Sequence, residues 1–143
     1  MITRVLVAVD DTGASIRAAS VAAELADRTG CRLRALNVFQ DGVLTGFVAE
    51  VVGDGAVEEA RRVAGSSILE HVGRIARSHG VCVESCERDG EPGPEILAEA
   101  RAWGADLVVL GRSAPRAGGS PKVVDGVNRH VLEFSDVPVL LVP

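Results

Sequence analysis

The sequence predicts an α/β fold: a doubly wound parallel sheet of five strands in the order 3-2-1-4-5, with helices on both faces. Short continuous apolar runs alternate with longer amphipathic stretches along the 143 residues, which is the pattern of a parallel sheet covered by helices. Aromatic residues make up only 3% of the chain, and such a composition suits a core of small side chains. We therefore expect one domain over residues 1–143.

Five apolar runs are expected to form the strands: Thr3–Asp10, Arg32–Phe39, Val81–Arg88, Ala105–Gly111 and Val137–Val142. The first, fourth and fifth runs are almost unbroken in Val and Leu, which is typical of strands that are buried on both faces. The third run alternates apolar residues with Glu and Ser, so we expect it at an edge of the sheet.

Four amphipathic segments are expected to form the helices: Ala14–Gly30, Ala56–Gly80, Pro94–Gly104 and Lys122–Ser135. The first three segments end at a glycine, the residue that most readily ends a helix. One further stretch, Gln40–Gly55, mixes glycines with an apolar cluster. It could be a lid, a partner surface or an irregular helix folded onto the edge of the sheet.

Charge and composition exclude several classes of protein. The net charge is −5 and there is no run of Lys or Arg, so we expect no nucleic-acid partner. No apolar stretch approaches 18 residues, so we expect no membrane association and a cytoplasmic location. The three cysteines, Cys31, Cys82 and Cys86, form no metal-binding spacing, and we expect them to be buried, inert thiols.

The acidic pair Asp10–Asp11 directly follows the first predicted strand. In the receiver domains of two-component signalling, such a pair holds Mg²⁺ beside an aspartate that accepts a phosphoryl group. Here the residue that ends the run "DLVVL" is Gly111, which has no side chain to accept one. The final strand also ends without the lysine that such a site needs, so we reject this interpretation.

Ligands of doubly wound sheets bind where the strand order reverses, at the carboxyl ends of the strands. In the order 3-2-1-4-5 this point lies between the first and fourth strands, so Asp10 and Gly111 are expected to face each other across it. The loop after Gly111 carries Arg112, Arg116 and Lys122 and leads into a helix, an arrangement that can bind an anion. A solvated connection explains the same composition equally well.

Three long stretches of the chain together resemble the universal stress protein family. They are "RVLVAVDDTGASIRAASVAAELADRTGCRLRALNVF", "GEPGPEILAEARAWGADLVVLGRS" and "VNRHVLEFSDVPVLLV", and they follow the order of that family over nearly the whole chain. The resemblance implies a Rossmann-like sheet of five strands and a homodimer that pairs through the last strand, Val137–Val142. An apolar strand at a sheet edge is an aggregation hazard unless another strand covers it, which favours the same pairing.

Members of this family that hold ATP share a phosphate loop: Gly, two residues, Gly, nine residues, Gly, then Ser or Thr. The present chain keeps Gly111 but has Ala114 at the second glycine. Asp125 and Gly126 stand at the final pair, and ten residues, 115–124, fill the interval of nine. A carboxylate at position 125 repels a triphosphate, unless Mg²⁺ bridges the two.

The resemblance implies that Ala8, Val9, Asp10 and Val38 line an adenine base and its ribose, with Asp10 accepting a hydrogen bond. Ordinary core packing explains the three apolar residues equally well, and Asp10 could simply cap the following turn. The complete candidate site for ATP, with Mg²⁺, is Ala8, Val9, Asp10, Val38, Gly111, Arg112, Ala114, Asp125, Gly126 and Val127.

We expect no enzyme activity beyond slow ATP hydrolysis. The loop "DDTGAS" lacks the motifs with which related sheets activate substrates, and the histidines His71, His79 and His130 are scattered over predicted helices. Two functions remain. The chain is either a stress-response module regulated by a bound adenine nucleotide, or a dimeric interaction protein whose nucleotide site is vestigial.

Overall fold

The computed structural model describes residues 1–40, 53–112 and 124–143. In these ranges the strands are β1 (Arg4–Ala8), β2 (Arg32–Phe39), β3 (Val83–Asp89), β4 (Leu107–Gly111) and β5 (Val139–Val142). The helices are α1 (Gly13–Thr29), α3 (Asp54–Ser78), α4 (Pro92–Trp103) and α5 (Gly126–Phe134). All pairings are parallel and the order is β3-β2-β1-β4-β5, which confirms the predicted sheet.

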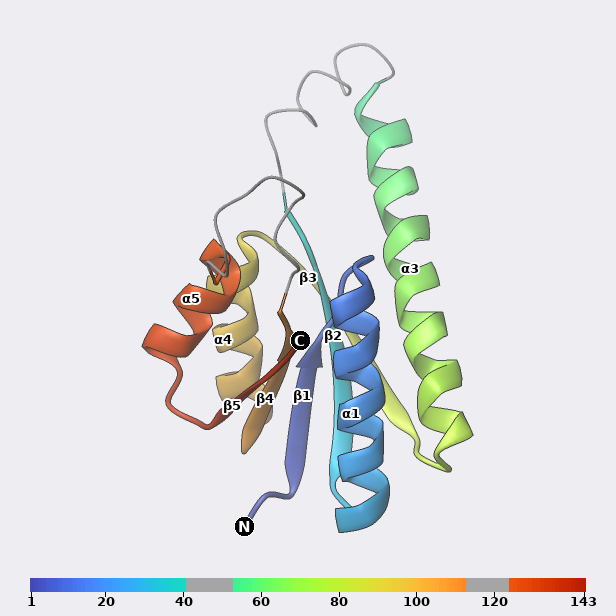
Figure 1. Ribbon diagram of the computed structural model, residues 1–143. Helices are drawn as coiled ribbons and strands as arrows, with labels where there is room; N and C mark the ends of the chain where they lie inside the picture. Colours follow the sequence, from blue (N-terminus) through green and yellow to red (C-terminus); the bar gives the residue numbers. More distant parts are fainter. Residues whose placement is uncertain (41–52, 113–123) are drawn as a thin grey trace.

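Helices cover both faces of the sheet, with α1 and α3 on one side and α4 and α5 on the other (Figure 1). Along β1, Val5 and Val7 point to the α1 and α3 side, and Leu6 points to the α4 and α5 side. Helix α1 packs closely because its buried face is built of small residues: Ala14, Ser15, Ala18, Ala19, Ala22, Ala23 and Ala26. Apolar side chains thus fill two layers, one on each side of the sheet, with β1 at its centre.

Local hydrogen bonds define where the helices start and stop. Thr12 caps α1, because its side chain accepts a hydrogen bond from the Ser15 N–H at 3.2 Å. Gly30 and Gly104 end α1 and α4 in the left-handed conformation, with φ of 71° and 73°, as the glycine stops predicted. Helix α5 starts at Gly126 rather than at the predicted Lys122, because Asp125 takes the capping position.

The two outer strands differ in how well the sequence predicted them. β3 is an edge strand, as its alternating pattern indicated. β5 is the other edge strand of the described sheet and pairs with β4, as the predicted order placed it. Its apolar run was also expected to be buried on both faces, and that expectation is wrong, because Leu140 is 36% exposed and Val139 and Leu141 are only partly buried. An unbroken apolar run therefore marks an outer strand here as well as an inner one.

The cysteines are not buried as predicted. Cys82 is exposed, and Cys31 and Cys86 are half-buried, because none of them lies in the central strands. Burial raises the pKa of the Cys86 thiol, which favours its protonated, unreactive form. The ambiguous stretch Gln40–Gly55 lies for the most part outside the described residues, and its last residues, Asp54 and Gly55, open α3.

No helix in the described ranges is long and apolar enough to span a bilayer.

Candidate functional site

A pocket of about 280 Å³ lies at the carboxyl ends of β1, β2 and β4, where the strand order reverses. The loop after β1 forms one wall, and the N-terminal ends of α4 and α5 form the opposite wall. Its lining residues are Ala8, Val9, Asp10, Thr12, Ser15, Leu36, Val38, Gln40, Pro92, Ile96, Leu110, Gly111, Asp125, Val127 and Asn128. The pocket therefore sits where doubly wound sheets hold their ligands.

Most of the residues predicted from the sequence meet in this pocket. They are Ala8, Val9, Asp10, Val38, Gly111, Asp125 and Val127. Arg112 and Gly126 are exposed and do not line the pocket. The Arg112 N–H donates to the Val142 carbonyl at 2.6 Å, and Gly126 is the first residue of α5. Ala114 lies outside the described residues.

Asp10 organises the turn that forms one wall of the pocket. Its Oδ1 accepts hydrogen bonds from the Thr12 N–H at 2.9 Å and from the Thr12 hydroxyl at 2.6 Å. The Asp10 N–H in turn donates to the Ser15 hydroxyl oxygen at 2.7 Å. Asp10 is therefore a turn-capping residue, as the plainer alternative predicted, and it lies at the pocket as well.

Gly111 is where β4 meets the start of α1. A Cβ on Gly111 would lie 2.5 Å from the carbonyl carbon of Ala14 and 2.6 Å from the amide nitrogen of Ser15. Real Cβ atoms do not approach backbone atoms so closely, so only glycine fits between strand and helix at this point. The close approach brings the end of β4 next to the loop that carries Asp10.

Asp125 and Asn128 form a hydrogen-bonded unit at the start of α5. Asp125 Oδ1 accepts the Asn128 N–H at 2.8 Å, and Asp125 Oδ2 accepts from the Asn128 side-chain amide at 3.2 Å. The same amide donates to the Gly111 carbonyl at 3.0 Å. Asn128 is only 4% exposed, so the unit fixes α5 against the end of β4.

Asp10 and Asp125 are the only ionisable side chains among the described residues that line the pocket. The remaining wall is apolar along the strands and carries hydroxyl and amide groups at Thr12, Ser15 and Asn128. This combination of apolar surface and a few polar groups is typical of small-molecule sites. The charge of the described lining is negative, which bears on the kind of ligand that it accepts.

Sequence reasoning missed part of the lining. The missed residues are Thr12, Ser15, Leu36, Gln40, Pro92, Ile96, Leu110 and Asn128. Two signals were present: Thr12 is a strong capping residue before a helix, and Pro92 lies in the stretch "GEPGPEILAEARAWGADLVVLGRS", one of the three on which the resemblance rests. Asn128 gave no signal, because its role depends on the position at which α5 starts.

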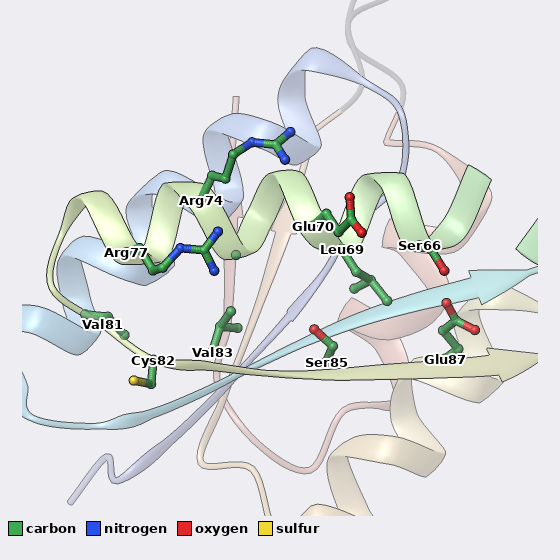
Figure 2. Close-up of a pocket in the computed structure, with 11 residues that line it drawn as sticks. Ser66, Leu69, Glu70, Arg74, Arg77, Val81, Cys82, Val83, Ser85 and Glu87 are labelled. Carbon is green, nitrogen blue, oxygen red and sulfur yellow. The ribbon is translucent and has the colours of Figure 1, made fainter. Parts of the chain in front are cut away.

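A larger hollow of about 960 Å³ lies elsewhere, between α3 and the outer strand β3. Figure 2 shows Arg74, Arg77 and Glu70 on the helix above Val83 and Glu87 on the strand. None of the residues that the sequence predicted for a site lies there. Its size reflects a helix resting on the edge of a sheet, so the smaller pocket is the better candidate.

Beside the candidate pocket, α4 is tied to β2 and β3 by a network of ion pairs that the sequence did not reveal. Glu99 is 5% exposed and accepts from Arg34 at 2.6 Å and from Arg88 at 2.8 Å. Burial disfavours its charged form, but these hydrogen bonds outweigh that cost and hold the pKa of Glu99 below its ordinary value. Arg34 also pairs with Glu84 and stacks 4.6 Å from the Trp103 ring.

The described residues contain no group of three or more His, Cys, Asp or Glu side chains arranged to hold a metal ion. The Mg²⁺ that could accompany ATP, as a bridge between Asp125 and the phosphates, would thus rely on Asp125 and on the nucleotide itself. Both Asp125 oxygens already accept hydrogen bonds from Asn128. The residues described here do not by themselves form a Mg²⁺ site.

Comparisons of the sequence and of the structure with known proteins point to the same family. A sequence model described as "Universal stress protein family" matches residues 1–143. Universal stress protein YxiE of Bacillus subtilis is 33% identical over 150 aligned positions, which cover 99% of each chain. The structure of universal stress protein UspA from Lactobacillus plantarum is similar with a TM-score of 0.81 and 20% identity, and the match covers 99% of this chain and 98% of that one.

Several similar structures contain an adenine nucleotide. The universal stress protein from Archaeoglobus fulgidus was solved in complex with dAMP. It matches this chain with a TM-score of 0.69 and 20% identity, over 100% of this chain and 98% of that one. At 20% identity, the similarity shows that the two proteins share a fold.

Proposed function

Because the chain belongs to the universal stress protein family, we propose that it is a stress-response module regulated by an adenine nucleotide in the pocket at the carboxyl ends of β1, β2 and β4. One observation carries the proposal. Seven residues that sequence resemblance assigned to a nucleotide site, from four separate parts of the chain, line a single pocket. The dAMP bound by the Archaeoglobus relative supports the same ligand class.

The chemistry of the pocket supports an adenine ligand. Ala8, Val38 and Val127 provide accessible apolar surface for a planar base, and Asp10 and Thr12 provide accessible polar groups. The volume of about 280 Å³ lies just below the range of about 300–1,000 Å³ that is common for ligand sites. A nucleoside with few substituents suits a pocket of this size better than a large cofactor does.

Thermal unfolding with added AMP tests the proposal. A ligand present at 100 times its Kd stabilises the folded state by about 2.7 kcal/mol, which should raise the Tm by several degrees. In amide NMR spectra, we expect AMP to shift Val9, Gly111 and Val127, and to leave Val83 and Ser85 beside the second hollow unchanged. The absence of any shift at millimolar AMP, dAMP and ATP would contradict the proposal and favour the vestigial alternative.

We further propose that the protein acts by binding rather than by turnover. Asp10 and Asp125, the ionisable groups of the described lining, are both occupied by hydrogen bonds that shape the turn and the α5 cap. Both Asp125 oxygens and the Asp10 Oδ1 are thus used to hold the structure together. Incubation with ATP and Mg²⁺ should therefore release phosphate no faster than a buffer control, and multiple turnovers per hour would overturn this assignment.

Self-association through β5 is part of the same proposal. β5 is an outer strand, and Val139, Leu140 and Leu141 are all partly exposed on the isolated chain. A second copy would pair with its free edge and cover these side chains. In analytical ultracentrifugation we expect a dimer that Leu140→Lys dissociates, whereas Leu132→Lys, at a 45% exposed position on α5, leaves it intact. A cytoplasmic location stays a prediction from the sequence.

A further inference from the structure

Asp125 places a carboxylate at the point of the pocket where helix α5 begins. We propose that this carboxylate makes the pocket selective for adenine nucleosides and nucleoside monophosphates over di- and triphosphates. The inference rests on the proposed function, because it concerns which members of the adenine ligand class the site accepts. It assigns to Asp125 the role of a specificity-determining residue.

The first step of the argument is that the start of α5 already holds an anion. The free N–H groups and the dipole at a helix N-terminus usually attract phosphates. Here Asp125 Oδ1 accepts the Asn128 N–H at 2.8 Å, and its Oδ2 accepts the Asn128 side-chain amide at 3.2 Å. The Asn128 N–H and the Asn128 side-chain amide, two of the donors at the start of α5, are thus engaged by the protein's own carboxylate.

The second step concerns the charge around the ligand. Among the lining residues that the structure describes, Asp10 and Asp125 carry negative charge, and no lysine, arginine or histidine accompanies them. Arg112, which directly follows the lining residue Gly111, is exposed and lies outside the lining. Each phosphate added to a bound nucleoside therefore increases repulsion inside a partly dry pocket, where charges interact more strongly than in water.

The third step concerns Mg²⁺, which could in principle bridge Asp125 and a triphosphate. Asp125 accepts hydrogen bonds from Asn128 at both carboxylate oxygens, and Asn128 also donates to the Gly111 carbonyl at 3.0 Å. A cation bound to Asp125 would compete with these hydrogen bonds, and because Asn128 is only 4% exposed, weakening them is costly. Added Mg²⁺ is therefore not expected to reverse the preference.

The test measures affinity by isothermal titration calorimetry for adenosine, AMP, ADP and ATP, each with and without Mg²⁺. For the natural chain, we expect the Kd to rise with each phosphate, so that ATP binds at least tenfold more weakly than adenosine. In Asp125→Asn, which keeps a capping oxygen and removes the charge, we expect this ratio to fall at least fivefold while the Kd of adenosine changes by less than twofold.

Asp136→Asn is the matched control. Asp136 is exposed, pairs with Arg101 at 3.2 Å and lies outside the pocket, so its substitution removes the same charge from a distant position. Its ratio of ATP to adenosine affinity should equal that of the natural chain. Asp125→Ser, which also keeps a capping oxygen, provides a second uncharged variant should the asparagine variant fold poorly by circular dichroism.

The outcomes separate the two proposals. If adenosine and AMP bind and ATP binds as tightly as adenosine, the selectivity inference is wrong and the proposed function stands. The selectivity inference is also wrong, and the proposed function also stands, if the ratio of the ATP Kd to the adenosine Kd is the same in both Asp125 variants as in the natural chain. If no adenine compound binds the natural chain or the variants, the proposed function is wrong and the inference falls with it.

Discussion

At the scale of single residues, Gly111 controls how closely strand and helix approach at the pocket. A Cβ there would lie 2.5 Å from the Ala14 carbonyl carbon, so Gly111→Ala must push α1 away from β4. Overpacking of this kind costs about 1–3 kcal/mol. We expect Gly111→Ala to lower the free energy of unfolding by that amount, measured by urea denaturation, and to weaken binding of AMP as the pocket widens.

Gly126→Ala is the control for this prediction. No heavy atom lies within 4 Å of a Cβ built on Gly126, and its backbone does not need the left-handed conformation. Alanine favours the helix that starts there by up to about 1 kcal/mol relative to glycine, so this variant should be at least as stable as the natural chain. Equal stability of the two variants would show that the close approach at Gly111 is relaxed in solution.

Individual pocket residues could be predicted where they stand at a strand end. Asp10 and Gly111 follow buried apolar runs, and the ends of parallel strands meet at one edge of the sheet, so their proximity follows from the fold class. Asn128 could not be predicted in this way. Its contact with Gly111 depends on the exact start of α5, and sequence patterns define helix ends only within a few residues.

At the scale of elements, the ion pairs of Glu99 connect α4 to β2 and β3, and they predict a dependence of stability on pH. Because the pKa of Glu99 is lowered in the folded state, its contribution is complete above its ordinary pKa of about 4.3 and disappears as the pH falls through the lowered value. Glu99→Gln leaves Arg34 and Arg88 without their shared carboxylate. We expect a loss of about 2 kcal/mol or more at pH 7 by urea denaturation.

The pH profile distinguishes this ion-pair effect from a packing defect. The difference in unfolding free energy between the natural chain and Glu99→Gln should shrink steadily below about pH 4, where the natural carboxylate also becomes protonated. Glu24→Gln removes an exposed pair with Arg28 on α1 and should cost no more than about 0.5 kcal/mol at any pH. A constant deficit for Glu99→Gln down to pH 3 would contradict the electrostatic explanation.

The elements themselves were predictable in type, and least predictable at their ends. The apolar spacing through Val124, Val127 and Val131 suggested a helix from Lys122, yet the structure starts it at Gly126. Asp125 is a strongly preferred N-cap residue, and this preference outweighs the apolar spacing that begins before it. The ion pairs of Glu99 left no signal in the sequence. Glu99 lies on α4, Arg34 on β2 and Arg88 on β3, and only the tertiary fold brings these three elements together.

At the scale of the whole molecule, stability should decrease from the central strands outward. Val5, Leu6 and Val7 of β1 and Val108 and Val109 of β4 are at most 1% exposed. In contrast, α3 contains no buried residue from Gly55 to Ala64, and Figure 1 shows its N-terminal turns beyond the start of α1. Helical turns without a buried face gain little from packing.

Hydrogen exchange measured by mass spectrometry checks this gradient. We expect amides of β1 and β4 to exchange only through global unfolding, and amides of residues 57–64 to exchange at least a hundredfold faster than those of residues 69–76 in the same helix. Uniform protection along α3 would contradict the expectation. It would indicate that another surface, such as a second copy of the chain, covers the N-terminal turns in solution.

The overall topology could be predicted because two independent patterns agree. Buried runs of Val and Leu require a sheet covered on both faces, and the polar alternation of β3 places that strand at an edge. The predicted order also places β5 at the other edge, whereas the exposure of its side chains could not be predicted from its composition, since an apolar run fits an outer strand as well as an inner one.

The hydrogen bond between the Asn128 amide and the Gly111 carbonyl has a consequence for chain length. It holds together the two ends of the segment between these positions. The entropy of closing a loop grows only with the logarithm of its length, so that even doubling it costs about 0.6 kcal/mol. The one extra residue in the interval 115–124 is therefore almost neutral for folding, and we expect this interval to tolerate short glycine-serine insertions that leave the Tm nearly unchanged.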